Sequence, residues 1–228
     1  MEMNQGQGKA YERVIEYVKQ EILSGELRQG QKLMPERELA EHLGVGRNSV
    51  REALRTLGII GVISSTQGAG NFVACNFEKS LVEWMTMMFL LQRTNHRQIS
   101  ELRQGLEIQA AYLAIDKISD ETILGLRQIV DELSQSTDER RNVAMDKQLH
   151  YRIAQASENP LIVEILQALS DVMDIFIKDL RREILMDVKS KDRLQNAHES
   201  MVQALQMRDR DQLTAAYHEH FLLINNAL

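Results

Sequence analysis

The sequence predicts a mainly α-helical chain with two domains, of which only the first contains β structure. Three observations lead to this fold class. Apolar residues recur every three or four positions through most of the 228 residues, β-rich runs occur only at 59–64 and 71–74, and the chain has just two prolines. We therefore predict an N-terminal domain over 1–75 and an all-helical antiparallel bundle over 76–228.

The N-terminal domain is expected to form three helices and a small hairpin. An amphipathic helix over 9–23 comes first, and a short helix follows that ends at Gly44. The next helix carries Val50 and Leu54 on one face, and the two β-rich runs are joined by the glycine-rich turn 67–70. Two helices across a tight glycine turn, followed by a hairpin, form a winged helix-turn-helix, so we expect this domain to bind double-stranded DNA.

The net charge of −6 at first argues against a nucleic-acid partner. Residues 1–75, however, hold nine basic and nine acidic residues, so the excess of acidic residues belongs to the remainder of the chain. Four arginines gather around the proposed helix-turn-helix: Arg37, Arg47, Arg51 and Arg55. The charge balance is therefore compatible with DNA binding.

The second helix of this motif offers Arg47, Asn48 and Arg51 on the face opposite its apolar stripe. An arginine in the major groove can donate two hydrogen bonds to guanine, which discriminates against other bases by roughly 1–3 kcal/mol. Asn48 suits a base or a phosphate, and Ser49 suits a phosphate at the helix start. The alternative is an ordinary solvated helix face, which the glycine turn and the wing make less favourable.

The segments RELAEHLGVGRNSVREALRTL and QGAGNFV resemble the winged helix-turn-helix of GntR-type bacterial regulators. The resemblance implies a homodimer on a pseudo-palindromic operator, with Arg37, Arg47 and Arg51 contacting DNA and Gly68 at the tip of the wing. The chain departs from the family by having Met34-Pro35 before the glutamate and Gly46 in place of Ser or Thr. The first departure removes a side-chain cap from the helix start.

The C-terminal part reads as helices throughout, and two of them carry clear apolar stripes. The expected helices cover 80–92, 97–116, 120–134, 138–157, 160–180, 191–207 and 209–227. In the first, the expected inward residues are Leu81, Trp84, Met85, Met88 and Leu91. In the second, they are Ile99, Leu102, Leu106, Ala110 and Leu113.

Ionisable residues interrupt the apolar stripes of three of these helices. Asp146 and His150 are four residues apart and share one helix face, while His198 and His220 each occupy a core position of a later helix. His218, two residues from His220, points away. A single buried histidine is usually a core residue with a satisfied hydrogen bond. Three histidines and one aspartate converging from three helices instead suit a divalent metal: zinc first, or nickel, manganese or iron.

Arg103 is a further charged residue on an apolar stripe, and a buried guanidinium needs an anion. One interpretation is a structural ion pair with Glu107 or another carboxylate. The other is a bidentate contact with the carboxylate of a bound ligand.

The segments ELRQGLEIQAAYLA, DKQLHYRIAQASENPLIVEIL and HESMVQALQMRDRDQLTAAYHEHF resemble the all-helical FCD effector domain of the FadR-type subgroup of GntR regulators. In metal-containing members the matching positions bind a divalent ion, which implies this role for Asp146, His150, His198 and His220. The effector-contacting arginine of the family matches Arg103.

We therefore expect a dimeric transcriptional repressor whose operator affinity is controlled by a small hydroxy, keto or sugar acid bound beside the metal. The alternatives are a regulator that senses metal without an organic effector and a metal-dependent enzyme. The sequence shows no signal peptide and no apolar run long enough to span a membrane, and its single cysteine, Cys75, suits a reducing cytoplasm.

Overall fold

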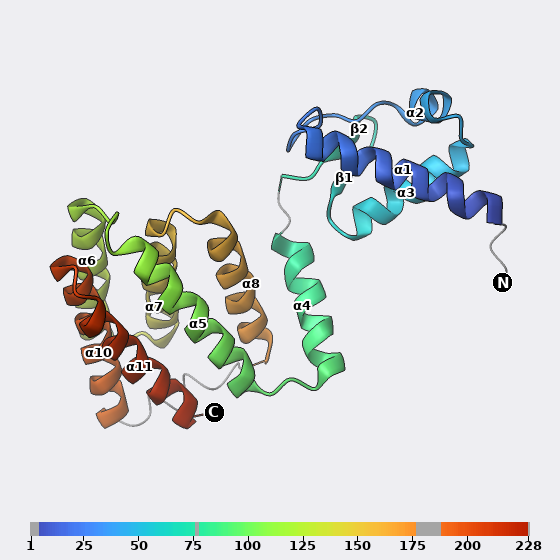
Figure 1. Cartoon of the computed structure of the whole chain (residues 1–228). Coiled ribbons are helices and arrows are strands. Elements are labelled where there is room, and N and C mark those ends of the chain that lie inside the picture. Colours follow the sequence, from blue (N-terminus) through green and yellow to red (C-terminus); the bar gives the residue numbers. More distant parts are fainter. Residues whose placement is uncertain (1–4, 76–77, 177–187, 228) are drawn as a thin grey trace. The chain divides into compact units, whose positions relative to one another are not determined.

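The computed structural model describes residues 5–75, 78–176 and 188–227, and the chain divides into two compact units, Met1–Glu83 and Trp84–Leu228. Figure 1 shows a small N-terminal unit of helices with one hairpin and a larger unit built of helices. The mainly α-helical fold class is confirmed. Among the described residues, no helix is both long and apolar enough to cross a membrane.

The N-terminal unit consists of three helices and a two-stranded antiparallel sheet. Its elements are α1 (Gln5–Ser24), α2 (Glu36–Leu43), α3 (Arg47–Ile59), β1 (Ile63–Thr66) and β2 (Gly70–Val73). Val14 and Val18 of α1 share one buried core with Val50 and Leu54 of α3. Strand β1 pairs with β2 in a register that places Ile63 opposite Val73. This core holds α3 against α1, so that the other face of α3 remains exposed.

The turn between α2 and α3 is the tight glycine turn that the sequence predicts. Gly44 has φ of +59°, a left-handed conformation that favours glycine, and its N–H points to the carbonyls of Ala40 and Glu41. Pro35 precedes α2 without a side-chain cap, as expected, and Gly46 likewise gives α3 no side-chain cap. Both helix starts therefore depend on tertiary packing.

The first strand starts four residues later than the sequence predicts. The run 59–64 was expected to be β structure, but α3 continues through Ile59 and β1 starts at Ile63. The N–H of Ile60 still donates to the carbonyl of Thr56 at 3.0 Å, and Gly61, with φ of +82°, turns the chain into the strand. Ile59 is thus the last residue of the helix, and Ile60 and Gly61 belong to the turn that leads into the strand.

The C-terminal unit is a bundle of helices around one main apolar core. Helix α4 (Glu78–Gln92) contains the boundary between the two units, at Glu83 and Trp84. The other described helices of the C-terminal unit are α5 (His96–Ala114), α6 (Asp120–Gln135), α7 (Glu139–Ala156), α8 (Pro160–Phe176), α10 (Val188–Met207) and α11 (Arg210–Ala227). Ser119 caps α6 and Asp138 caps α7, as their sequences predict. Leu126, Leu149 and Leu205 are fully buried in the core. The predicted end of the long helix, 177–180, lies outside the described residues.

Two predicted inward stripes were partly wrong. In α4, Trp84, Met88 and Leu91 are exposed, at 51%, 48% and 77%, whereas Phe89 is buried. In α5, Leu102 is exposed, and the buried positions are Ile99, Ser100, Glu107, Ala110, Ala111 and Ala114. The buried face of α5 is therefore rotated from the predicted one, toward the positions that contact α7, α8 and α11. Periodicity identifies residues that share a face, but the neighbouring helices decide which face is covered.

Candidate functional site

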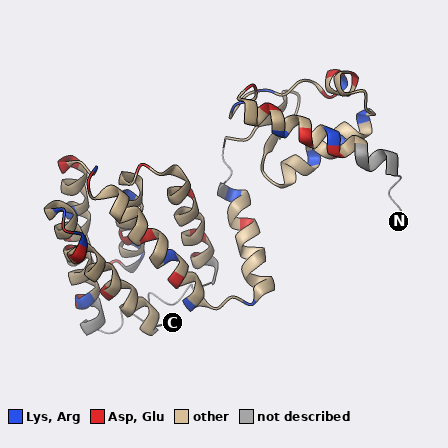
Figure 2. Ribbon diagram, viewed as in Figure 1, with Lys and Arg blue, Asp and Glu red and all other residues tan. Residues whose placement is uncertain are grey.

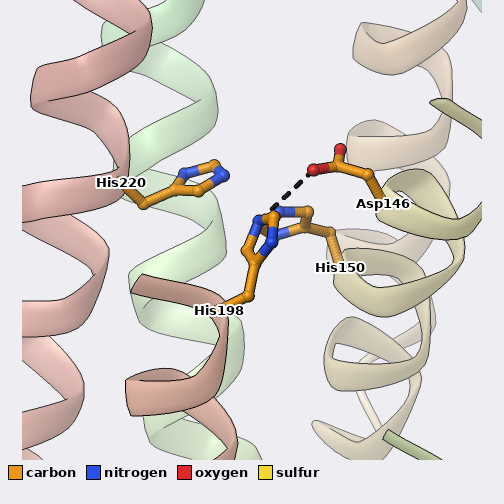
Figure 3. A group of neighbouring side chains, drawn as sticks. All are labelled: Asp146, His150, His198 and His220. Carbon is orange, nitrogen blue, oxygen red and sulfur yellow. Dashed lines mark ion pairs between the residues drawn. The ribbon is translucent and has the colours of Figure 1, made fainter. Parts of the chain in front are cut away.

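Four ionisable side chains meet inside the C-terminal bundle (Figure 3). Asp146 and His150 come from successive turns of α7, His198 from α10 and His220 from α11. One potential ligand atom from each residue lies within 4.8 Å of all the others. The three imidazole ring centres are 4.7–5.5 Å apart. The structure thus brings together all four residues that the sequence singled out for a metal.

Apolar packing on each helix keeps this cluster away from water. Leu149 and Ile153 flank His150 on α7, Met201 follows His198 on α10, and Phe221 adjoins His220 on α11, all at 1% exposure or less. Asp146 is 5% exposed and His150, His198 and His220 are 6%, 2% and 1% exposed. His218, by contrast, is exposed, and its Nδ1 lies 3.0 Å from the side-chain amide of Gln104, so it points away from the cluster as predicted.

The protonation chemistry of the cluster suits metal ligands. Burial, reinforced by the neighbouring imidazoles of His150 and His198, lowers the pKa of His220 well below 6.5. His220 is therefore neutral near pH 7, which leaves a ring nitrogen lone pair for a metal. Asp146 adds a carboxylate, whose Oδ1 lies 3.3 Å from Nε2 of His198.

The donor set fits a divalent metal ion. Nε2 of His150 and Nδ1 of His220 are buried and have no hydrogen-bond partner among the described residues. Such atoms are costly to bury unless something binds them. Three imidazoles with one carboxylate match the preference of zinc, and also of nickel, manganese or iron, and leave coordination positions for further ligands.

Glu107, which the sequence offers only as an ion-pair partner of Arg103, also lies next to this cluster. It lies on α5, is 3% exposed, and accepts a 2.5 Å contact from Nε of Arg103 through Oε1. Its Oε2 lies 2.7 Å from Nδ1 of His150, a close contact without the geometry of an aligned hydrogen bond. Burial raises the pKa of Glu107, but the charges of Arg103 and His150 outweigh burial and hold the pKa below its usual range. Glu107 is thus an anion at neutral pH.

A small cavity adjoins this carboxylate on the side of α5, α7 and α8. Arg103, Glu107, Lys147 and His150 give it a polar wall, and the remaining lining residues include Leu166. Its volume of about 40 Å³ suits one or two water molecules. Ligand pockets typically measure roughly 300–1,000 Å³, so an organic ligand requires the surrounding helices to move apart. Of the two interpretations of Arg103, the ion pair with Glu107 is present in this structure.

The predicted DNA contacts lie on the N-terminal unit, where Figure 2 shows both basic and acidic residues. Arg37, Arg47, Asn48 and Arg51 are exposed on α2 and α3. Gly68 is exposed in the turn between the strands, with φ of +75°. Ser49 differs from these residues, because it is only 5% exposed and packs toward the domain core. Its hydroxyl offers little surface to a phosphate, since the side chain lies on the buried face of α3.

Comparisons with known proteins agree with this architecture. Residues 10–73 match the family described as bacterial regulatory proteins, gntR family, and residues 98–223 match the FCD domain. The HTH-type transcriptional regulator LutR of Bacillus subtilis is 29% identical over 210 residues, covering 91% of this chain and 95% of LutR. The putative L-lactate dehydrogenase operon regulatory protein of Escherichia coli is 27% identical, covering 89% of this chain and 80% of that protein.

A solved structure, Streptococcus agalactiae GntR, shares the fold with a TM-score of 0.68, covering 96% of this chain and 100% of that chain at 23% identity. The relatives are transcriptional regulators, which confirms that the chain belongs to a class of regulators and not of enzymes. Both family matches fall on the two parts that the sequence distinguished. The chain is a member of the GntR family of bacterial regulatory proteins, in the subgroup that carries an FCD domain.

Proposed function

We propose that this protein is a homodimeric, cytoplasmic repressor whose DNA binding is controlled by a small carboxylate bound beside a divalent metal in its C-terminal domain. We assign DNA binding to residues 1–75 and effector binding and dimerisation to 76–228. The observation that carries the proposal is the buried cluster of Asp146 and three histidines next to an arginine-lined cavity, in a chain that also has a DNA-binding domain.

Asp146, His150, His198 and His220 would hold the metal, with zinc as the first choice. When bound, the metal supplies positive charge and open coordination positions for oxygen ligands. Arg103 supplies a planar guanidinium, which suits a carboxylate. Together they favour an acid with a second oxygen on the neighbouring carbon, such as a hydroxy, keto or sugar acid. One relative is named for an L-lactate dehydrogenase operon, and lactate is such an acid.

Ligand binding would change the packing of the bundle, because the cavity is too small for an organic acid. The cavity lies between α5, α7 and α8, so these helices must separate to admit the ligand. A dimeric regulator must match two half-sites one or more helical turns apart, and a small change of spacing weakens binding. The coupling needed for a useful response is about 1–3 kcal/mol.

On DNA, we assign base contacts to Arg37, Arg47 and Arg51, a base or phosphate contact to Asn48, and a backbone contact at the wing to Gly68. All five residues are exposed on one unit. The burial of Ser49 argues against its predicted phosphate contact, so we leave Ser49 out of the proposed surface.

Operator binding measured with and without acids tests the proposal. An operator selected from random DNA by the wild-type protein is titrated in the presence of zinc, with L-lactate, glycolate, pyruvate or gluconate added in turn. At least one acid should shift operator affinity. Arg103→Ala should lose the response while keeping operator affinity, and Arg97→Ala, an exposed arginine on the same helix, should keep both. A full panel that leaves wild-type affinity unchanged overturns the proposed ligand class.

A regulator that responds to metal alone is the second candidate. Glu107 already neutralises Arg103, so the cavity does not require an organic anion for charge balance. Such a protein would change its operator affinity when zinc is removed by a chelator and restored, with no effect of any acid.

A further inference from the structure

We infer that Glu107 is a positioning residue for the metal centre and that it links this centre to the acid-binding cavity. The part of this inference that concerns acid binding rests on the proposed function. The part that concerns metal binding depends only on the buried cluster. Glu107 lies on α5, whereas the four residues of the cluster come from α7, α10 and α11. It therefore adds a fourth helix to the centre without being one of its ligands.

The two carboxylate oxygens of Glu107 contact different residues. Oε1 contacts Nε of Arg103 at 2.5 Å, and Oε2 lies 2.7 Å from Nδ1 of His150. Because Nδ1 of His150 faces this carboxylate, Nε2 is the ring nitrogen left to face a metal, and it has no hydrogen-bond partner among the described residues. Carboxylates behind ligating histidines fix the ring orientation and raise the basicity of the nitrogen that binds the metal.

A purely structural ion pair would be a simpler explanation, and α5 contains one for comparison. Arg97 and Glu101 form the same i,i+4 pair at 3.2 Å, with side chains 68% and 56% exposed. Arg103 and Glu107 are 13% and 3% exposed. A buried ion pair contributes little net stability compared with apolar residues, so its position between a cavity and a cluster of potential ligands favours a role in the site.

The same carboxylate opposes the binding of an acid in the cavity. Glu107 and Arg103 both line the cavity, and Glu107 already occupies one edge of the guanidinium. An incoming carboxylate meets a like charge and must share or displace this contact. Glu107 therefore strengthens metal binding through His150 and weakens acid binding through Arg103. Loss of its charge changes the two affinities in opposite directions, whereas general damage to the fold would weaken both.

The variant Glu107→Gln tests this prediction, with Glu101→Gln as the matched control on the same helix. Zinc affinity is measured alone, by competition with a chromogenic chelator, and L-lactate affinity is measured by calorimetry on zinc-saturated protein. Glu107→Gln should bind zinc about 10- to 100-fold more weakly. It should bind L-lactate at least as tightly as the wild type does. Glu101→Gln should leave both affinities unchanged.

Glu107→Gln leaves Arg103 without its partner and could prevent folding, so a second pair of variants is used. Arg103→Gln is compared with the double variant Arg103→Gln/Glu107→Gln, in which both charges are absent. The double variant should bind zinc about 10- to 100-fold more weakly than Arg103→Gln does. Equal zinc affinity in this pair overturns the inference, even if wild-type protein binds zinc. Failure of wild-type protein to bind L-lactate contradicts that choice of effector alone, because the zinc comparison still decides the role of Glu107.

Discussion

Arg51 on α3 is held by Glu36 on α2, because its Nε and Nη2 both lie 3.3 Å from Oε2 of the glutamate. The arginine is 67% exposed and the glutamate 35% exposed. The contact uses the edge of the guanidinium that carries Nε and Nη2. The other edge, formed by Nη1 and Nη2, suits the paired acceptors of guanine. Glu36 therefore fixes the direction of an arginine that we assign to base recognition.

Glu36→Gln should lower the discrimination between operator and scrambled DNA. The substitution frees Arg51 from its orientation, so the ratio of specific to nonspecific affinity should fall about tenfold, within the roughly 1–3 kcal/mol that a paired base contact contributes. Nonspecific affinity should rise, because one negative charge near the phosphates is lost. Glu38→Gln removes the other first-turn carboxylate of α2 and serves as the control. An unchanged ratio in Glu36→Gln would show that Glu36 does not orient Arg51 on DNA.

His198→Ala should abolish tight metal binding, whereas His218→Ala should leave it intact. His198 is 2% exposed and lies in the cluster, while His218 is exposed and contacts Gln104. Metal content after dialysis against zinc, measured by elemental analysis, distinguishes the two variants. Circular dichroism checks that both retain their helices. Equal zinc content in wild type and His198→Ala would exclude the proposed ligand set.

The metal-free protein should become less stable as the pH falls below about 6.5. Burial lowers the pKa of His220 in the folded state, so the unfolded chain takes up a proton in this range that the folded chain does not. Glu107 also makes the folded protein less stable on acidification, but at lower pH. Its pKa is below the ordinary value of 4.5, because Arg103 and His150 outweigh burial, so its stabilising contribution is lost as the pH falls through the folded-state pKa.

Thermal unfolding of chelator-treated protein at about pH 5 and about pH 7.5 measures this effect. Each unit between the two pKa values of a histidine is worth about 1.4 kcal/mol. The melting temperature should be lower at the acidic pH, and His220→Gln should reduce the difference. A melting temperature that rises on acidification would contradict the assignment of a neutral, buried His220.

Gly44→Ala should destabilise the N-terminal unit, and Gly58→Ala should not. Gly44 has φ of +59°, where a side chain costs roughly 1–2 kcal/mol, although nothing lies within 4 Å of the added Cβ. Gly58 lies inside α3, and its added Cβ would meet only the Ile63 carbonyl at 3.7 Å, so alanine should add up to about 1 kcal/mol of helix stability. Calorimetry of the full chain checks both signs. Equal effects would show that backbone conformation at the turn is not what requires Gly44.

The sequence predicted the helices best where capping residues or glycines mark their ends. Ser119, Asp138 and Gly44 are local signals, and the structure places helix ends at all three. The convergence of Asp146 with the three histidines was also predictable, because helical spacing placed each on an apolar stripe. Whether a metal binds there stays a prediction.

The environment of α5 could not be predicted with the same accuracy. Arg103, Glu107, Ala110 and Ala114 follow helical spacing, so a buried stripe through them was available in the sequence. The leucines at 102, 106 and 113 suggested a rotated stripe, because hydrophobicity alone favours them. Only the contacts with α7, α8 and α11 decide between the two faces, and these contacts are long-range.

The burial of the four-residue cluster has a kinetic consequence. A chelator cannot reach an ion whose ligands are 1–6% exposed until α7, α10 and α11 part. Release of a bound metal would then follow the opening rate of the bundle and would not accelerate with more chelator. The protein would keep the ion it acquired on folding through short fluctuations in the supply of free metal, so the site would act as a lasting component of the domain.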